Sequence, residues 1–325
     1  MLLSLFAGGP AELTSYGSGA ALQTDDRMSL EFTAVRALYA PPDDNASILR
    51  ALRARAVPPG VVATAIKRAD ARDWTARGVA GLRAAAFGMA HESFRRALAL
   101  DSRAAVALRG SADAASGAHS EAEETTWLRA LAAAEPDNAL ARVELSHVLA
   151  ALGHTEEAIA AAVEATRIDP ASAEPLEQLA SIFADLGDAA RLAPIAGTLV
   201  ERFPAREEGR YYQAAALFLQ GRAADAERAI GTLLSVNPRH AKGQNLRGVA
   251  CASLGNHECA KAAFDASLES NPRDSSVYVN LGYLNLERGD PSAATGFFRE
   301  ALAIDTTSEA ARRGLADARA ATTGR

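Results

Sequence analysis

Hydrophobic and polar residues alternate along most of this chain with the period of an α-helix. Near the C-terminus, Tyr278 and Gly282 fall on one face of a first predicted helix, and Ala294 and Phe298 fall on one face of a second. Gly289 stands between them, where glycine can end a helix at little conformational cost. The pattern therefore predicts two helices joined by a tight turn.

This helix pair recurs every 34 residues. Proline marks the period, because it lacks an N–H and stands where each second helix should end. The marker prolines are Pro136, Pro170, Pro204, Pro238 and Pro272. Seven units fit this period without an insertion, and they begin at Ala71, Ala105, Ala139, Ala173, Glu207, Ala241 and Ser275. The sequence therefore predicts an all-α solenoid of seven helix-turn-helix repeats over residues 71–308.

Some positions depart from the common pattern. The first two units have Ala85 and His119 where later units have the turn glycine, so we expect their turns to move to nearby glycines, Gly88 and Gly117. Pro194 falls inside a second helix and is expected to kink it. A small residue recurs where paired helices touch. At Gly282, the last of these positions, we expect leucine to overpack the contact and alanine to be nearly neutral.

The segments outside the repeats are predicted from weaker patterns. Residues 309–320 read as an amphipathic capping helix, and residues 321–325 read as a loose tail. Residues 41–70 indicate a helical lead-in of two helices separated by a Pro-Pro pair. Residues 1–40 do not fit the repeat and read as an irregular head with one short strand-like run.

The repeat resembles the tetratricopeptide repeat over residues 71–308. The residues of the first unit that match the family pattern are Trp74, Gly78, Ala90, Phe94 and Ala97. The resemblance implies a right-handed superhelix that acts as a non-catalytic interaction scaffold. It implies a peptide or a partner protein as the ligand, bound in the concave groove.

The groove residues follow from the position of each residue within its repeat. Stacked repeats place their first helices on the concave wall, so one face of each first helix should meet the ligand. The predicted groove residues are Tyr211, Ala215, Phe218, Leu219, Asn245, Val249, Val279, Tyr283 and Leu286. A secondary acidic patch, expected to favour basic ligands, comprises Glu174, Glu177, Asp185 and Glu208. The alternative is that the aromatic groove residues fill the core.

The head carries a second resemblance, in the run "LQTDDRMSLEFTAVRALY". About the first 45 residues resemble the C-terminal end of bacterial spermidine-synthase-like proteins. The matching residues are Thr24, Asp25, Asp26, Leu30, Glu31 and Phe32. The resemblance implies an alternative function, in which this chain is the regulatory or interaction arm of an aminopropyltransferase. The catalytic domain of that enzyme would be absent from this chain.

Composition narrows the classes of function. Hydrophobic residues make up 49% of the chain, which is enough for an extensive core. The formal charge of −6 argues against a nucleic-acid partner, since such binding depends on cationic contacts to phosphate. The sequence contains no apolar stretch of the length that spans a bilayer, so we expect no membrane insertion and a cytoplasmic protein.

No residues with catalytic or metal-binding spacing stand out. Cys251 and Cys259 match no common metal spacing, and we interpret them as two small buried side chains rather than a disulfide. The six histidines are scattered, without a helical ligand pair. We therefore expect no enzymatic activity, no cofactor and no metal.

Overall fold

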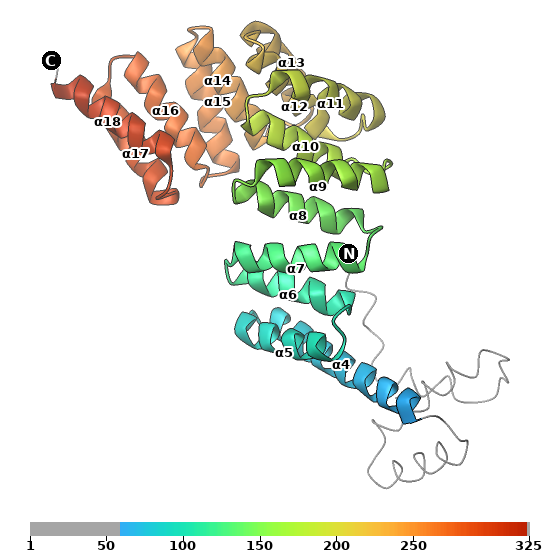
Figure 1. The fold of residues 1–325 in the computed structure, drawn as a ribbon. Coiled ribbons are helices and arrows are strands. Elements are labelled where there is room, and N and C mark those ends of the chain that lie inside the picture. The colour runs from blue at the N-terminus through green and yellow to red at the C-terminus, as the bar shows by residue number, and fades with distance from the viewer. Residues whose placement is uncertain (1–58, 324–325) are drawn as a thin grey trace. The chain divides into compact units, whose positions relative to one another are not determined.

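The computed structural model describes residues 59–323, and every regular element in that part of the chain is an α-helix (Figure 1). The chain divides into two compact units, with the boundary between Ala134 and Glu135. The predictions for the head, residues 1–40, and for residues 41–58 of the lead-in lie outside the described residues. These include the match to spermidine-synthase-like proteins.

The helices come in pairs within each unit. Unit 1 contains α4 (Pro59–Arg83), α5 (Phe87–Leu100), α6 (Ala105–Gly117) and α7 (Glu121–Ala134). The first helices of unit 2 are α8 (Ala139–Ala151), α10 (Glu174–Asp185), α12 (Glu207–Leu219), α14 (Ala241–Ser253) and α16 (Ser275–Glu287). Its second helices are α9 (Thr155–Ile168), α11 (Ala189–Arg202), α13 (Ala223–Val236), α15 (His257–Ser270) and α17 (Pro291–Ile304). The final helix is α18 (Glu309–Thr323).

The 34-residue period predicted from the sequence is confirmed. The second helices begin at Phe87, Glu121, Thr155, Ala189, Ala223, His257 and Pro291, at a constant spacing. Two boundaries differ from expectation. α4 is one continuous helix that joins the end of the lead-in to the first repeat, and α18 continues to Thr323 instead of ending at residue 320. Helix α11 runs through Pro194 to Arg202 without a break in the helix.

Unit 2 has two layers of helices. Its first helices contact one another in series, from α8 through α10, α12, α14 and α16 to α18. Among the helices described in this unit, no second helix contacts another second helix. The first helices therefore form a closely spaced inner layer, and the second helices form an outer layer that is spread further apart.

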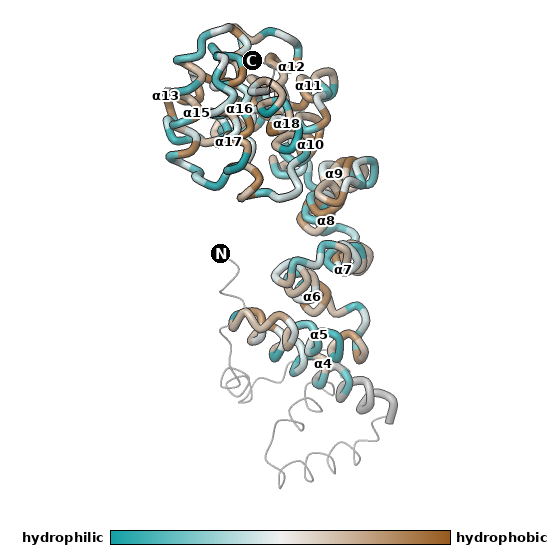
Figure 2. The backbone as a smooth tube through the Cα atoms, turned by 90° about the vertical axis from the view of Figure 1, so that its left-hand side faces the viewer, coloured by the Kyte–Doolittle hydropathy of each residue, from teal (hydrophilic) through white to brown (hydrophobic). Residues whose placement is uncertain are grey.

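Hydrophobic and hydrophilic segments alternate along the helices (Figure 2). This follows from their amphipathic pattern, because each helix buries one face against its neighbours. Of the helices in the described part of the chain, none is long and apolar enough to cross a membrane.

In three of the seven repeats, the core contact between the paired helices is a phenylalanine ring on a glycine. Phe298 of α17 is fully buried, and a Cβ atom placed on Gly282 of α16 would lie 2.5 Å from its Cε1. Gly314 of α18 would meet the same ring. A methyl group at residue 282 therefore has no room, and this corrects the expectation that alanine would be nearly neutral there.

The turns of the first two repeats stay in register. Ala85 and His119 adopt left-handed φ angles of 52° and 57°, at the position where the later repeats have glycine. The N–H of Ala86 donates to the carbonyl of Gly81 at 2.9 Å, and every later turn has the same bond across five residues. This backbone closure requires a left-handed residue whatever its side chain. The expected shift to Gly88 and Gly117 is therefore wrong.

We expect Gly282→Ala to lower the free energy of unfolding by about 1–3 kcal/mol, because the methyl group overpacks a ring that cannot move. Gly296 of α17 provides the matched control, since it is exposed and a Cβ there would meet nothing within 4 Å. Gly296→Ala should stabilise the chain by up to about 1 kcal/mol through helix propensity alone. Urea unfolding followed by circular dichroism measures both. Equal effects of the two substitutions would contradict the packing described here.

Two opposite substitutions, one that introduces glycine at a left-handed turn and one that removes it, test the strain of these turns. Ala85→Gly should raise the free energy of unfolding by up to about 1 kcal/mol, because glycine removes the steric cost of a positive φ. Gly153→Ala, at the same register position with a φ of 77°, should lower it by a similar amount. Thermal unfolding of the two variants should therefore shift in opposite directions, and a shift in the same direction would exclude turn strain as the cause.

Candidate functional site

A pocket opens on the inner layer of unit 2. We call it the inner pocket; its volume is about 190 Å³, and the first helices of four successive repeats line it. The lining residues are Ser181, Ala184 and Asp185 of α10, Tyr211 and Tyr212 of α12, Lys242 and Asn245 of α14, Asp274, and Ser276 of α16. The periodicity that stacks the first helices side by side thus brings together residues far apart in sequence.

Aromatic rings form one wall of the inner pocket. The ring of Tyr211 lies edge-on to that of Tyr212 at 5.2 Å and 5.8 Å from the ring of His240. His240 is fixed in turn, because its Nδ1 accepts a hydrogen bond from the N–H of Gly243 at 2.9 Å and caps α14. Tyr211 is therefore held in place from both sides.

The polar groups of the inner pocket differ in the number of hydrogen bonds they form with other residues of the chain. Asp274 caps α16, where its Oδ1 accepts from the N–H of Ser276 at 3.0 Å and from its hydroxyl at 2.6 Å. Asn245 accepts a hydrogen bond from Asn280 at 2.8 Å and donates to the Ser276 hydroxyl at 3.3 Å. This polar ladder joins α14 to α16 along the inner layer.

Asp185 and Lys242 are the charged groups of the inner pocket that have no close partner. Neither forms an ion pair or a side-chain hydrogen bond with any residue that the structure describes. Asp185 is open to solvent, yet the protein atoms around its carboxylate raise its pKa by desolvation, which the charge of Lys242 partly offsets. Burial also raises the pKa of Tyr211, and the charges of Asp185 and Asp274 add to that effect.

Three of the residues predicted from the sequence lie together at this pocket: Tyr211, Asn245 and Asp185. Other predicted groove residues belong to the core, since Ala215 and Val279 are each only 7% exposed. Neither residue is aromatic, so their burial does not bear on the alternative that the aromatic groove residues fill the core.

The remaining predicted groove residues are partly open. Phe218, Val249 and Leu286 are half-buried, and Leu219 and Tyr283 are each 37% exposed. The Tyr283 ring packs edge-on against Phe298 at 5.1 Å, and its hydroxyl lies 3.5 Å from a backbone carbonyl oxygen of α18.

Sequence reasoning missed Ser181, Tyr212 and Asp274 as pocket residues. Asp274 carried a detectable signal, because an aspartate directly before a predicted helix is a preferred N-cap and so lies at the helix end. Ser181 stands at the same repeat position as the predicted groove residues Ala215 and Val249, so the period could have identified it. Tyr212 carried no signal, because its repeat position is not among those expected to face the groove.

The acidic patch is largely neutralised within the chain. Arg206 pairs with Glu177 through two bonds of 2.5 and 2.7 Å and with Glu174 at 2.8 Å. Burial raises the pKa of Glu177, and the bonds from Arg206 oppose that shift. Glu208 is half-buried, and its negative charge also raises the pKa of Glu177. Of the predicted patch, only Asp185 therefore lines the inner pocket.

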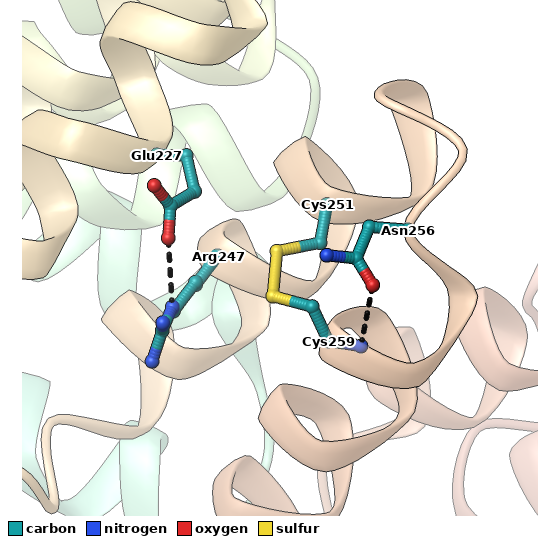
Figure 3. The surroundings of a disulfide bond; sticks show 5 residues. All are labelled: Glu227, Arg247, Cys251, Asn256 and Cys259. Carbon is teal, nitrogen blue, oxygen red and sulfur yellow. Dashed lines mark hydrogen bonds and ion pairs between the residues drawn. A yellow bond between two sulfur atoms is a disulfide. The ribbon is translucent and has the colours of Figure 1, made fainter.

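A second cluster of reactive side chains lies between α13, α14 and α15. Cys251 and Cys259 form a disulfide, so the interpretation as two separate buried side chains is wrong (Figure 3). The tight turn explains the bond, because it folds α15 back against α14 and leaves the two Cα atoms 5.8 Å apart. The carboxylate of Glu227 and both sulfur atoms lie within 4.8 Å of one another.

Parts of the chain match known repeat families. Residues 220–260 and 254–309 match one family model described as Tetratricopeptide repeat, and residues 139–172 match another. No curated protein matches the chain in sequence. The comparisons give no support to the resemblance of the head to spermidine-synthase-like proteins.

Solved structures with the same repeat share the fold. A tetratricopeptide repeat protein from Parabacteroides merdae has a TM-score of 0.71 at 15% identity, over 77% of this chain and 99% of its own. A Thermus thermophilus repeat protein has a TM-score of 0.52 at 24% identity, over 56% of this chain and 99% of its own. Yeast Tom70 has a TM-score of 0.53 at 15% identity, over 94% of this chain and 66% of its own. The chain therefore carries tetratricopeptide repeats and has their helical solenoid fold.

The Arg206 contacts predict a stability effect. Arg206→Met should lower the free energy of unfolding by about 1–3 kcal/mol, because it leaves the carboxylate of Glu177, whose side chain is 14% exposed, without a partner. Adding Glu177→Gln should recover part of that loss, which urea unfolding of the single and double variants would measure.

The control is Arg167→Met in α9, which removes an exposed pair with Glu164. That change should cost much less than the change at Arg206, because solvent screens an exposed ion pair. A loss at Arg206 no larger than at Arg167 would show that the Glu177 carboxylate is well solvated.

Proposed function

We propose that this chain is a non-catalytic binding protein whose inner layer holds an extended segment of a partner protein, with a basic side chain of that segment in the inner pocket. Tetratricopeptide repeats generally mediate protein–protein interactions, and solenoids bind along their inner surfaces. The observation that carries the proposal is the inner pocket itself. A side chain that enters it contacts the first helices of four successive repeats.

The charges of the inner pocket favour a cation. Two carboxylates, Asp185 and Asp274, stand against one ammonium group, Lys242, which leaves a formal charge of −1. Asp274 is already engaged as the cap of α16, whereas Asp185 is not. Lys242 is exposed, and its flexible stem lets it turn toward solvent. A guanidinium or ammonium group of the ligand can then pair with Asp185 in a charge-assisted hydrogen bond.

The dimensions favour a peptide over a free small molecule. The volume of about 190 Å³ is below the roughly 300 Å³ at which pockets for drug-sized ligands begin, and it suits one side chain. On the same face of α12, Phe218 lies seven residues after Tyr211, about 10 Å along the helix. Val249 follows Asn245 by one turn of α14. These apolar side chains offer contacts to the rest of an extended segment.

An array of short peptides tests the proposal, with lysine, arginine, glutamine or glutamate at the central position of each sequence. We expect peptides with a central lysine or arginine to bind the wild-type chain and glutamate peptides to fail. Asp185→Asn should weaken the best binder at least about tenfold, the effect expected from losing a charge-assisted hydrogen bond. Affinity should also fall as the pH drops through the raised pKa of Asp185, since the neutral acid no longer attracts a cation.

The fold serves as an internal control in this experiment. Folding already disfavours the charge of Asp185, so Asp185→Asn should not lower the unfolding temperature at neutral pH. Glu300→Gln removes an exposed carboxylate from the outer helix α17 and should leave binding unchanged. Equal binding by wild type and Asp185→Asn would overturn the assignment of the pocket. Absence of any peptide preference would overturn the proposed ligand class.

A further inference from the structure

The disulfide of unit 2 lies among groups that can bind a metal. Cys251 stands near the end of α14 and is only 2% exposed, and Cys259 is the third residue of α15 and is half-buried. Glu227 comes from α13, so three successive helices supply the cluster. Because each group is anchored on a helix, the positions of their Cα atoms do not depend on the bond between the sulfur atoms.

Arg247 orients the carboxylate of this cluster. Its Nε lies 3.2 Å from Oε1 of Glu227, and Figure 3 shows this pair beside the disulfide. The second carboxylate oxygen of Glu227 has no hydrogen-bond partner among the residues that the structure describes, so it is available as a ligand atom. Ligating carboxylates in metal sites are commonly held in this way by a neighbouring hydrogen-bond donor.

Reduction changes what the cluster can do. A dithiol reductant supplies two electrons and two protons, breaks the S–S bond and leaves two thiols on facing helices, while the reductant becomes a disulfide. Loss of the two thiol protons then gives two thiolates. Together with Glu227 and Arg247 they carry a formal charge of −2, which a divalent cation neutralises.

We propose that the reduced chain binds a thiophilic divalent cation such as Zn²⁺ through Cys251, Cys259 and Glu227, and that the disulfide excludes it. Two thiolates select a soft or borderline cation over Mg²⁺ or Ca²⁺. Three protein ligands leave one position of a tetrahedral Zn²⁺ site for water. Glu227 and Cys259 are both partly exposed, which gives the cation a path to the site. This assignment does not depend on the proposed peptide ligand.

The test uses the full chain after reduction with a phosphine and removal of the reductant without oxygen. Titration with Cd²⁺, a spectroscopic substitute for Zn²⁺, should give thiolate-to-metal charge-transfer absorption that saturates at one cation per chain. Zn²⁺ added to the metal-free reduced chain should release about two protons per chain near neutral pH, because both thiols lose their protons on binding. The oxidised chain should give neither signal.

Substitutions assign the ligands. Cys251→Ser and Cys259→Ser should each abolish the signal, and Glu227→Gln should weaken binding at least about tenfold, as loss of a ligand or of its support does in other sites. Glu269→Gln, an exposed carboxylate elsewhere on α15, is the matched control and should bind like the wild type. Circular dichroism checks that each variant keeps its helical signal.

A second measurement does not depend on the variants. In the wild-type reduced chain, bound Zn²⁺ should protect both thiols from alkylation, as mass spectrometry of the two peptides would show. Absence of binding by the reduced chain, or alkylation of the thiols at the same rate with and without Zn²⁺, would overturn the site. Binding that needs both cysteines but is unchanged in Glu227→Gln would overturn the role of the carboxylate.

Discussion

The contact of a large side chain with a glycine backbone sets the spacing of the helices on which the rest of this structure depends. Phe298 fills the space between Gly282 of its own repeat and Gly314 of the following helix, and no Cβ fits at either position. Phe94 makes the same pair of contacts in unit 1. Because the ring is fully buried, the distance between helices is fixed by its thickness.

Side-chain volumes across this contact compensate from repeat to repeat. Phenylalanine occurs where the residue sixteen positions earlier is glycine, and a smaller side chain occurs where that residue is alanine or serine. The pairs are Gly78–Phe94, Ala112–Leu128, Ser146–Ala162, Ala180–Ala196, Ala214–Ile230, Gly248–Phe264 and Gly282–Phe298. Each repeat thus fills the space between its two helices with its own pair of side chains. Regular packing of this kind keeps the first helices side by side and makes an inner pocket across four of them possible.

The sequence predicted what depends on periodicity and missed what depends on individual side chains. The constant spacing placed every second helix, and it placed Tyr211, Asn245 and Asp185 on the inner face. The turns at Ala85 and His119 stay in register instead of moving to the nearby glycines, because closure of the turn depends on backbone position more than on residue type.

Contacts between distant side chains gave no periodic signal. The bonds from Arg206 to Glu177 join residues 29 apart, and which of several nearby acids an arginine reaches is decided by rotamers rather than by repeat position. The disulfide was within reach of sequence reasoning, since Cys251 and Cys259 stand on either side of one predicted turn. Disulfide bonds persist mainly in oxidising compartments, so this bond disagrees with the cytoplasmic location expected from the sequence.

The constant repeat length has a consequence for how such a chain can change by gene duplication. A whole 34-residue unit can be gained or lost by unequal crossing-over, because each unit contacts only its neighbours. The compensated volumes restrict this freedom, since a crossover inside a repeat must not separate a phenylalanine from its glycine. Crossovers in the turn between the paired helices would combine mismatched halves, whereas crossovers between repeats keep the pair within each repeat intact. They change only the contact that a ring such as Phe94 makes with the following repeat, at Gly110. The divergence of repeats within this array is therefore expected to follow whole units.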